Sequence, residues 1–376
     1  MPSDMQLLKE NLAVVEPVQD KAVGYFYATL FRRNPEVRSM FPLVMDVQRD
    51  RLFRALTSAV QGMDRPESLV PMLRQLARDH RKFGVRPEHY EVVGRALIGA
   101  VRQYSYGDWS EEIEAAWWRA FTMIARTMID AAAEVEHEPA TWQAEIVSHQ
   151  RRTLDIAVLR LRPDAPYPFE AGQYTTVESP WLPRVWRSYS MANAPRPGNE
   201  IELHVRRIGA GWVSGALLRK HQAGDVLRLG PPRGDTVLDR DSPRDLLCVA
   251  GSTGLAPMKA IIEDLGRSNT TRRAHLFFGA RLEEDLYDLD GLDDLAARHP
   301  WLTVIPTVSH DPGYPGEQGN AAEVAARRGA WQHHDVYVSG SPAMITAATA
   351  LFRELQVPAG RIRYDSFGDT GIVRGF

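Results

Sequence analysis

The sequence predicts a multidomain chain with three parts: an all-α segment, an antiparallel β-barrel, and an α/β segment built on a parallel sheet. Apolar residues recur every three or four positions through residues 20–131, which is the period of amphipathic helices. From about residue 142 they alternate with polar residues, as in strands with one buried face. From about residue 243 apolar strands alternate with helical stretches, and this order predicts a parallel sheet with crossover helices.

These changes of pattern place the expected domains at residues 1–134, 142–238 and 243–376, with the polar segment EVEHEPATW as the first linker. A chain of 376 residues fits this plan, since a domain takes about 150 residues. The net charge of −3, with both signs scattered, predicts no nucleic-acid surface. We expect no secretion signal and no membrane span. The single cysteine, Cys248, excludes an intrachain disulfide and fits a cytoplasmic protein.

The first part is predicted to hold five helices, separated by short breaks that contain proline or polar residues: 20–32, 50–60, 68–78, 89–103 and 112–131. Pro87 and Glu88 mark the start of the fourth helix. A proline needs no amide partner in a first helical turn, and an acidic side chain favours the positive helix end. The only histidine in the first 88 residues is His80, near the end of the third helix.

The second part contains five strand-like runs: LDIAVLRL, QYTTVE, RVWRSYSM, EIELHV and DVLRL. Arg187, Tyr189 and Ser190 form an Arg-x-Tyr-Ser pattern on the third run. An arginine neutralises a phosphate, a tyrosine stacks on a flat ring, and a serine donates to a ring nitrogen. Taken alone, the pattern fits an ordinary mixed barrel face equally well.

The third part opens with CVAGSTGLAPMKAII, in which a strand is expected to end at Ala250 and Pro257 to open a helix. Gly251 and Gly254 allow backbone amides to approach a pyrophosphate, which the helix N-terminus attracts. A later strand is expected to end at Gly340. Ligands of open parallel sheets gather at the carboxyl ends of strands. Two such ends predict one nucleotide cleft, although a plain strand–helix turn is the alternative for the first.

The order of these motifs resembles the ferredoxin-reductase family of flavin reductases over residues 142–376, with Ser339 where that family usually has cysteine. The resemblance implies that Arg187, Tyr189 and Ser190 hold FAD. The remaining cofactor-binding residues that it implies are Val213 and Ser214 for the FAD diphosphate, Gly251, Thr253, Gly254, Pro257 and Gly340 for NADH or NADPH, and Phe367 over the flavin ring.

A helical segment in front of such a reductase resembles a flavohaemoglobin, which implies that His80 is the axial ligand of haem b. The stretch GYFYATLFRRNPEVRSMFP matches the family's second helix and the corner after it, with Tyr27 in the helix and Phe41 against the haem. Gln48 and Leu52 are four residues apart and so share one helix face. By the resemblance Tyr27 and Gln48 hydrogen-bond oxygen, while Leu52 restricts the slot.

The side of the haem that carries the ligand departs from the family pattern at two positions. Tyr90 matches the tyrosine that supports the ligand histidine. Ala132, however, stands where a glutamate is usual, and Glu134 is expected to face away because two residues turn a helix by about 200°. Asp79 replaces a lysine before the ligand. We therefore expect a weaker donation of electron density to the iron.

The resemblance implies a nitric oxide dioxygenase that converts NO and O2 to nitrate, with electrons passed from NAD(P)H through FAD to haem. No coiled-coil pattern suggests assembly, so we expect a monomer. The altered positions leave a second interpretation open, an oxidoreductase that reduces peroxides or oxidises another donor. A non-enzymatic oxygen or redox sensor is the third, and the complete flavin and nucleotide motifs disfavour it. Glu283, Glu284 and Asp285 follow Arg281 and would repel a 2′-phosphate, which favours NADH.

Overall fold

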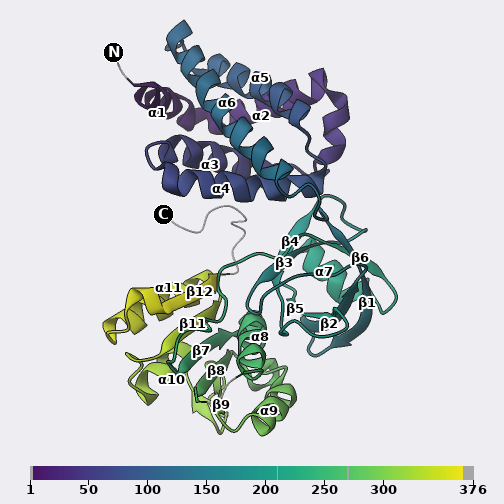
Figure 1. The fold of residues 1–376 in the computed structure, drawn as a ribbon, viewed down its shortest axis with the longest axis vertical. Coiled ribbons are helices and arrows are strands. Elements are labelled where there is room, and N and C mark those ends of the chain that lie inside the picture. The colour runs from purple at the N-terminus through teal and green to yellow at the C-terminus, as the bar shows by residue number, and fades with distance from the viewer. Residues whose placement is uncertain (1–2, 210, 269–270, 367–376) are drawn as a thin grey trace. The chain divides into compact units, whose positions relative to one another are not determined.

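The computed structural model describes residues 3–209, 211–268 and 271–366. These residues divide into two compact units, one that ends at Ala140 and one that begins at Thr141. The first unit is helical, and the second contains both β-sheets (Figure 1). Within the described ranges, no helix combines the length and apolar character that crossing a bilayer requires.

The first unit is built from α-helices joined by short 3₁₀ turns. Its helices are α1 (Asp4–Val15), α2 (Gln19–Arg33), α3 (Asp46–Gly62), α4 (Pro66–His80), α5 (Pro87–Tyr104) and α6 (Glu111–Ala133), and its 3₁₀ turns are η1 (Glu16–Val18), η2 (Pro35–Met40) and η3 (Arg81–Phe83). The start of α5 at Pro87 is the predicted one. The hydroxyl of Ser110 accepts a hydrogen bond from the Ile113 amide and so caps α6.

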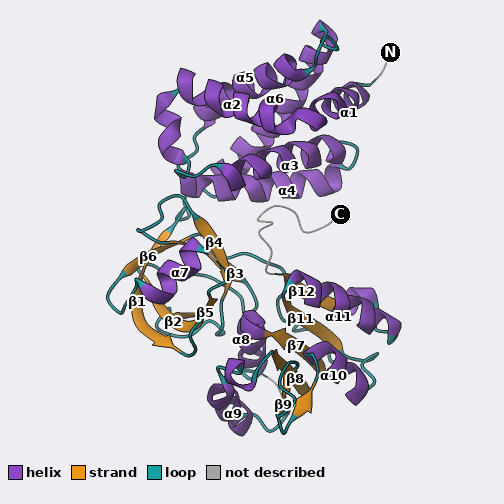
Figure 2. Ribbon diagram, turned by 180° about the vertical axis from the view of Figure 1, so that it is seen from behind, coloured by secondary structure: helices purple, strands orange, loops and turns teal. Residues whose placement is uncertain are grey.

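The helices of this unit form two layers, with α3 and α4 side by side below α2, α5 and α6 (Figures 1 and 2). One apolar cluster joins α1, α2, α3, α5 and α6 and includes Phe26, Leu30 and Trp117. A second cluster lies between α4 and α6 and includes Leu73. A Cβ atom at Gly94 of α5 would overlap the Phe121 ring of α6, so this glycine permits the close approach of the two helices.

The predicted antiparallel barrel is confirmed at the start of the second unit (Figure 2). Its strands are β1 (Trp142–Arg151), β2 (Ile156–Pro163), β3 (Tyr174–Glu178), β4 (Trp186–Ser190), β5 (Ile201–Arg206) and β6 (Val226–Leu229). They follow the order β4-β3-β6-β1-β2-β5. A bridge between Met191 and Leu203 joins the two outer strands, which closes the barrel. Helix α7 (Trp212–Arg219) packs on β5.

The predicted parallel sheet is also confirmed, in the order β10-β9-β8-β7-β11-β12. Its strands are β7 (Leu246–Gly251), β8 (Ala274–Ala280), β9 (Leu302–Val308), β10 (Glu317–Gln318), β11 (Asp335–Gly340) and β12 (Ile362–Ser366). The connections carry η4 (Ser252–Gly254), α8 (Leu255–Leu265), η5 (Glu283–Asp285), α9 (Leu289–Arg298), α10 (Ala321–Arg328), α11 (Pro342–Glu354) and η6 (Ala359–Arg361).

Helices cover both faces of this sheet. Alternate residues of each strand face opposite sides, and in β7 both sets are apolar and buried. Leu246 and Cys248 of β7 pack against α8 and α9. Leu247 and Val249 pack against α10 and α11. The chain leaves β7 for β8 on one side and returns to β11 on the other, so the strand order reverses at β7. Ligands of such sheets bind outside the carboxyl ends of the strands at this reversal.

Candidate functional site

His80 ends α4, and its ring is held by a backbone carbonyl. The Nδ1 atom lies 2.7 Å from the carbonyl oxygen of Leu76, one turn earlier. A carbonyl oxygen only accepts, so Nδ1 carries the proton and the basic lone pair is on Nε2. A hydrogen bond of this kind typically orients a metal-binding histidine. His80 is half-buried, and its geometry fits an axial haem ligand.

Tyr27 is a buried hydroxyl donor in α2, with 3% of its surface exposed. Its ring centroid lies 5.7 Å from that of Phe41, at the predicted corner. Its hydroxyl donates to the backbone carbonyl of Gln48 over 3.4 Å, and burial raises the pKa of the phenol well above its usual range. Leu52 of α3 packs against the same apolar cluster as Tyr27. The structure therefore brings these four predicted residues together in one helical unit.

Three further residues discussed for the surroundings of His80 lie near the ends of helices: Asp79 in α4, Tyr90 in α5 and Glu134 after α6. Tyr90 packs with Leu76 against the cluster between α4 and α6, and burial raises its pKa to about 12. Glu134 follows α6 and pairs with Arg74 of α4, where both side chains are more than a third exposed. It therefore meets α4 at a surface position. The Asp79 carboxylate lies 2.9 Å from Nζ of Lys82, whose side chain is buried.

The Arg-x-Tyr-Ser pattern occupies β4, which pairs with β3. Arg187 and Tyr189 are half-buried and share one face of the strand, because side chains alternate along a strand. Ser190 lies on the other face and is buried. Its hydroxyl donates to the Asp365 carboxylate on β12 over 3.1 Å, so it links the barrel to the parallel sheet. Arg187 and Tyr189 thus bring a guanidinium group and a phenol ring to one face of the strand, and both Arg187, through the Trp186 carbonyl, and Ser190 have protein partners.

The two residues expected at the FAD diphosphate lie in the first turn of α7. The side chain of Val213 belongs to the barrel core, so only its backbone amide can meet a phosphate. The Ser214 hydroxyl donates to the Gly211 carbonyl over 3.3 Å.

The turn after β7 brings two chain segments of the parallel sheet close together. A Cβ atom at Gly254 would overlap the backbone carbonyl of Ser339 at the end of β11, and one at Gly251 would overlap Met344. Gly254 is therefore required for packing, because its neighbour is backbone, whereas the flexible Met344 side chain could move away from a Cβ atom at Gly251. Gly340 adjoins Gly251, so the two predicted Gly/Ser turns do meet at one place.

One expectation about this turn is wrong. Pro257 does not open the helix: η4, with Thr253 at its centre, leads directly into α8 at Leu255. Pro257 is buried in the first turn of α8, where the missing amide hydrogen has no helical partner to lose. Ser339 is fully buried, and its hydroxyl is without a hydrogen-bond partner among the described residues. Phe367 lies outside the described residues.

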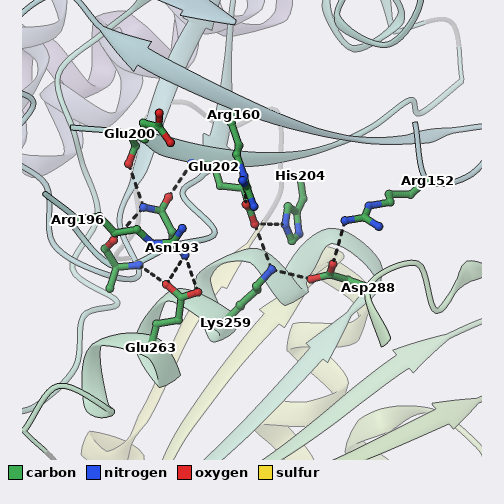
Figure 3. A network of polar contacts seen from close by, with 11 residues as sticks. Arg152, Arg160, Asn193, Arg196, Glu200, Glu202, His204, Lys259, Glu263 and Asp288 are labelled. Carbon is green, nitrogen blue, oxygen red and sulfur yellow. Dashed lines mark hydrogen bonds and ion pairs between the residues drawn. The ribbon is translucent and has the colours of Figure 1, made fainter. Parts of the chain in front are cut away.

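A cluster of charged residues between the barrel and α8 is not singled out by any sequence motif. It includes Glu202 and His204 of β5, Lys259 of α8, and Asp288 before α9 (Figure 3). The signal that was available is a lysine in the apolar first half of α8 and two polar residues that alternate with apolar ones in β5.

Known families match all three parts of the chain. Residues 24–128 match the globin family, residues 143–237 the oxidoreductase FAD-binding domain, and residues 248–350 the oxidoreductase NAD-binding domain. A flavohemoprotein of Bacillus subtilis is 26% identical over 97% of this chain and 96% of its own length. The reductase component of a naphthalene dioxygenase system from a Ralstonia species is 33% identical over 63% of this chain and 72% of its own length.

A solved structure shares the whole fold. The flavohemoglobin from Malassezia yamatoensis, determined with bound FAD and heme, superposes with a TM-score of 0.80 at 18% identity and covers 97% of this chain and 98% of its own. The globin, FAD-binding and NAD-binding segments occur here in the same order along one chain. The chain therefore belongs to the flavohaemoglobin family, whose members join a haem-binding globin to an FAD- and NAD(P)-dependent oxidoreductase.

Proposed function

We propose that this protein is a nitric oxide dioxygenase, which combines NO with O2 to form nitrate using electrons from NAD(P)H. The observation that carries the proposal is the pairing, in one helical unit, of an oriented histidine on α4 with a buried tyrosine donor on α2. When bound, haem would supply the iron that activates oxygen, and FAD would convert the hydride of NAD(P)H into single electrons.

The chain's own residues bind and orient in this proposal. His80 would hold the iron through Nε2, while the Leu76 carbonyl keeps the ring in the required tautomer. Tyr27 would donate a hydrogen bond to oxygen, and it keeps its proton because burial raises the pKa of its phenol. Leu52 would limit the space beside the ligand. Gln48 is half-buried on α3 and would be the second donor.

In the reductase unit, Arg187 would neutralise the FAD diphosphate and Tyr189 would stack on FAD. The amides of Val213 and Ser214 at the start of α7 would also meet the diphosphate. The turn from Gly251 to Gly254 would receive the pyrophosphate of the nicotinamide nucleotide. Gly340 adjoins this turn.

We propose NADH as the preferred electron donor. The 3₁₀ turn η5, Glu283–Asp285, follows β8 at its carboxyl end, where the ribose of the nucleotide is expected. Glu283 and Glu284 are exposed there, and their charges would repel a 2′-phosphate. We expect kcat/KM for NADH to exceed that for NADPH by roughly tenfold or more, because tenfold corresponds to only about 1.4 kcal/mol and a like-charge juxtaposition costs several kcal/mol.

A second candidate function is the reduction of peroxides or the oxidation of another donor. It is favoured by the ion pair between Glu134 and Arg74. That pair engages the glutamate nearest to the position of Ala132, so a carboxylate that would strengthen the ligand histidine is not supplied there. An oxygen or redox sensor is a third candidate, which the reductase unit disfavours because a sensor needs no supply of hydride.

The deciding experiment measures NO with an electrode during aerobic reaction with NADH, followed by determination of nitrate. The proposal expects rapid NO loss that needs both NADH and O2, with nitrate formed in equal amount. Faster NADH oxidation with hydrogen peroxide, without NO loss, would favour the second candidate. Reduction of the haem by NADH without turnover of either substrate would favour the sensor.

We further propose that the enzyme acts as a monomer in the cytoplasm. Its single cysteine is free and buried, which fits a reducing compartment. Light scattering at the mass of one chain, 42.3 kDa, is the expected result. A mass of two chains would contradict the monomer.

A further inference from the structure

Lys259 bridges two carboxylates at a buried position between the barrel and the parallel sheet (Figure 3). Its Nζ atom lies 3.1 Å from Oε1 of Glu202 on β5 and 2.8 Å from Oδ2 of Asp288, the residue before α9. The three side chains are 12%, 6% and 3% exposed. One cation on α8 therefore connects three separate elements.

The carboxylate of Glu202 has further partners that fix its direction. Oε1 also accepts from Nε2 of His204, 3.1 Å away, and Oε2 accepts from Nε of Arg160 over 3.2 Å. The other ring nitrogen of His204 lies 2.7 Å from the hydroxyl of Tyr287, which directly precedes Asp288. Burial alone would raise the pKa of Glu202, but the hydrogen bond from His204 and the charge of Lys259 lower it well below its usual range. The carboxylate is thus charged and held on several sides.

The barrel and α8 also share an apolar core beside this cluster. Ile156 and Val158 of the barrel strand β2 belong to the same core as the inner face of α8. Ala194 and Ala260 pack together nearby. Charges in such surroundings interact strongly, and a charge that loses its partner there is costly. The apolar contacts hold α8 to the barrel, while the charged contacts have direction and so define its register.

A second attachment lies one turn further along α8. The carboxylate of Glu263 accepts from the Ala194 amide over 3.1 Å and from Nη2 of Arg196 over 2.8 Å. A third attachment reaches the turn itself, since Nη1 of Arg206 on β5 lies 2.7 Å from the Ser252 hydroxyl. Strand β5 therefore holds both α8, through Glu202, and the glycine turn that precedes α8.

We propose that Lys259 is a positioning residue for hydride transfer: through Glu202 and Asp288 it fixes α8, and with it the nucleotide-binding turn, against the flavin-binding barrel. The inference rests on the proposed transfer of hydride from nucleotide to FAD, but not on NO as the substrate. Transfer between two bound rings depends steeply on their distance and angle. A small displacement of α8 would therefore lower the transfer rate more than it lowers nucleotide affinity.

The same geometry distinguishes positioning from direct binding of the nucleotide. Lys259 lies in the second turn of α8, and its two ionic partners among the described residues are buried carboxylates of the protein. A lysine that bound a nucleotide phosphate would change the dissociation constant for NADH. A lysine that only aligns α8 would change the rate constant of flavin reduction.

The test compares the Lys259→Met variant with the wild type as full-length protein loaded with FAD and haem. Anaerobic stopped-flow mixing with increasing NADH gives the limiting rate of flavin reduction and the dissociation constant of NADH separately. We expect the limiting rate to fall about tenfold to hundredfold, with a change of less than about threefold in the dissociation constant. The Lys259→Arg variant keeps the charge and should recover part of the rate.

A readout that needs no turnover is hydrogen–deuterium exchange without nucleotide. The amides of α8 and the η4 turn should exchange faster in Lys259→Met than in the wild type. The matched control is Glu200→Gln, which breaks the exposed pair between Glu200 and Arg162 on the same barrel. This control should change neither exchange in α8 nor flavin reduction.

If Lys259→Met does not fold, the charge-balanced variant Lys259→Met with Asp288→Asn replaces it, because Glu202 then keeps Arg160 and His204. An unchanged limiting rate would overturn the proposal, even with faster exchange in α8. A rise in the dissociation constant that accounts for the whole loss would also overturn it. Wild-type flavin that NADH and NADPH fail to reduce would remove its premise. Failure of NO consumption alone would leave it intact.

Discussion

At the scale of the residue, the proposed role of Tyr27 can be tested directly by substitution. Its hydroxyl is buried, has a raised pKa and, among the described residues, makes only a long hydrogen bond of 3.4 Å to the Gln48 carbonyl. We expect Tyr27→Phe to release oxygen faster by roughly tenfold to hundredfold, since a hydrogen bond to a polarised ligand contributes about 1.5–3 kcal/mol. Stopped-flow displacement of oxygen from the reduced protein measures this rate.

The matched control for that prediction is Tyr25→Phe. Tyr25 belongs to the same helix but is 38% exposed. Its replacement should leave oxygen release unchanged. Equal oxygen release in the wild type and Tyr27→Phe would show that Tyr27 serves the core of the helical unit alone, and Gln48 would become the remaining candidate donor.

Cys248 tests how strictly the core of the parallel sheet excludes solvent. It lies in β7, is fully buried, and burial raises the pKa of its thiol to about 12 from the usual 9. The folded state therefore favours the protonated thiol, and this contribution to stability is complete below pH 9 and decreases as the pH rises toward 12. At pH 8 we expect no reaction with a disulfide reagent over an hour, and full reaction in denaturant.

Rapid labelling of the native protein at pH 8 would contradict this expectation, because it would require frequent opening of β7. The rate in moderate denaturant serves as the control, since it should rise with the unfolded fraction.

The residue scale also shows what sequence cannot predict. The Ser179 hydroxyl lies 2.8 Å from Nε2 of His221, whose Nδ1 lies 3.0 Å from the Asp225 carboxylate. This is the connectivity of a catalytic triad. Ser179 is fully buried and accepts a hydrogen bond from the Trp181 amide, so its hydroxyl joins two barrel connections and is not a nucleophile. Burial decides between the two roles, and burial at this position depends on barrel closure.

At the scale of the element, the sequence analysis succeeded where it used a local signal, and it missed elements whose local signal it did not use or whose formation depends on pairing. The start of α5 followed from Pro87, whose effect is confined to its own turn. Helix α1 was missing from the prediction, although Leu8, Leu12 and Val15 have helical spacing and Ser3 caps it. Strand β12 was also missing. Its sequence IRYDS alternates apolar and polar residues over only four positions, and it forms an edge strand by pairing with β11.

The turn between β7 and α8 supports a prediction about an element. A Cβ atom at Gly254 would overlap the Ser339 carbonyl, so Gly254→Ala must move η4 or β11. We expect flavin reduction by NADH to slow at least about tenfold, because the displaced turn would carry the nucleotide with it. The free energy of unfolding should fall by about 1–3 kcal/mol, as is usual for overpacking. Stopped-flow reduction and denaturant unfolding measure the two effects.

The control for this turn is Gly360→Ala, because a Cβ atom at Gly360 meets no atom within 4 Å. It should leave both quantities near the wild-type values. A Gly254→Ala variant with normal flavin reduction would show that the turn tolerates displacement, and the proposed nucleotide position would have to move elsewhere.

At the scale of the whole molecule, the packing of one element determines whether the polar residues of another are buried or exposed. The run EIELHV predicts a strand with one apolar face, and Ile201, Leu203 and Val205 do fill the barrel core. Its polar side chains, Glu202 and His204, are buried as well, since α8 covers that face. A polar residue in an alternating strand normally indicates solvent. Only the packing of a helix more than fifty residues later in the chain shows that it indicates a buried ionic contact instead.

The division into two compact units predicts that the haem and flavin functions can be separated by single substitutions. His80 belongs to the helical unit, whose apolar clusters contain no residue of the reductase unit among those described. We expect His80→Ala to lose most of its haem, seen as a lower Soret absorbance relative to FAD, because it removes the axial ligand. The same protein should reduce ferricyanide with NADH at the wild-type rate, because the described residues proposed for hydride transfer to FAD all belong to the second unit. The control is His137→Ala, an exposed histidine of the helical unit, which should keep the haem and both activities. Retention of haem by His80→Ala would remove His80 as the ligand. Loss of ferricyanide reduction together with haem would show that the two units depend on each other for folding, so that the loss of a side chain in one core destabilises the other.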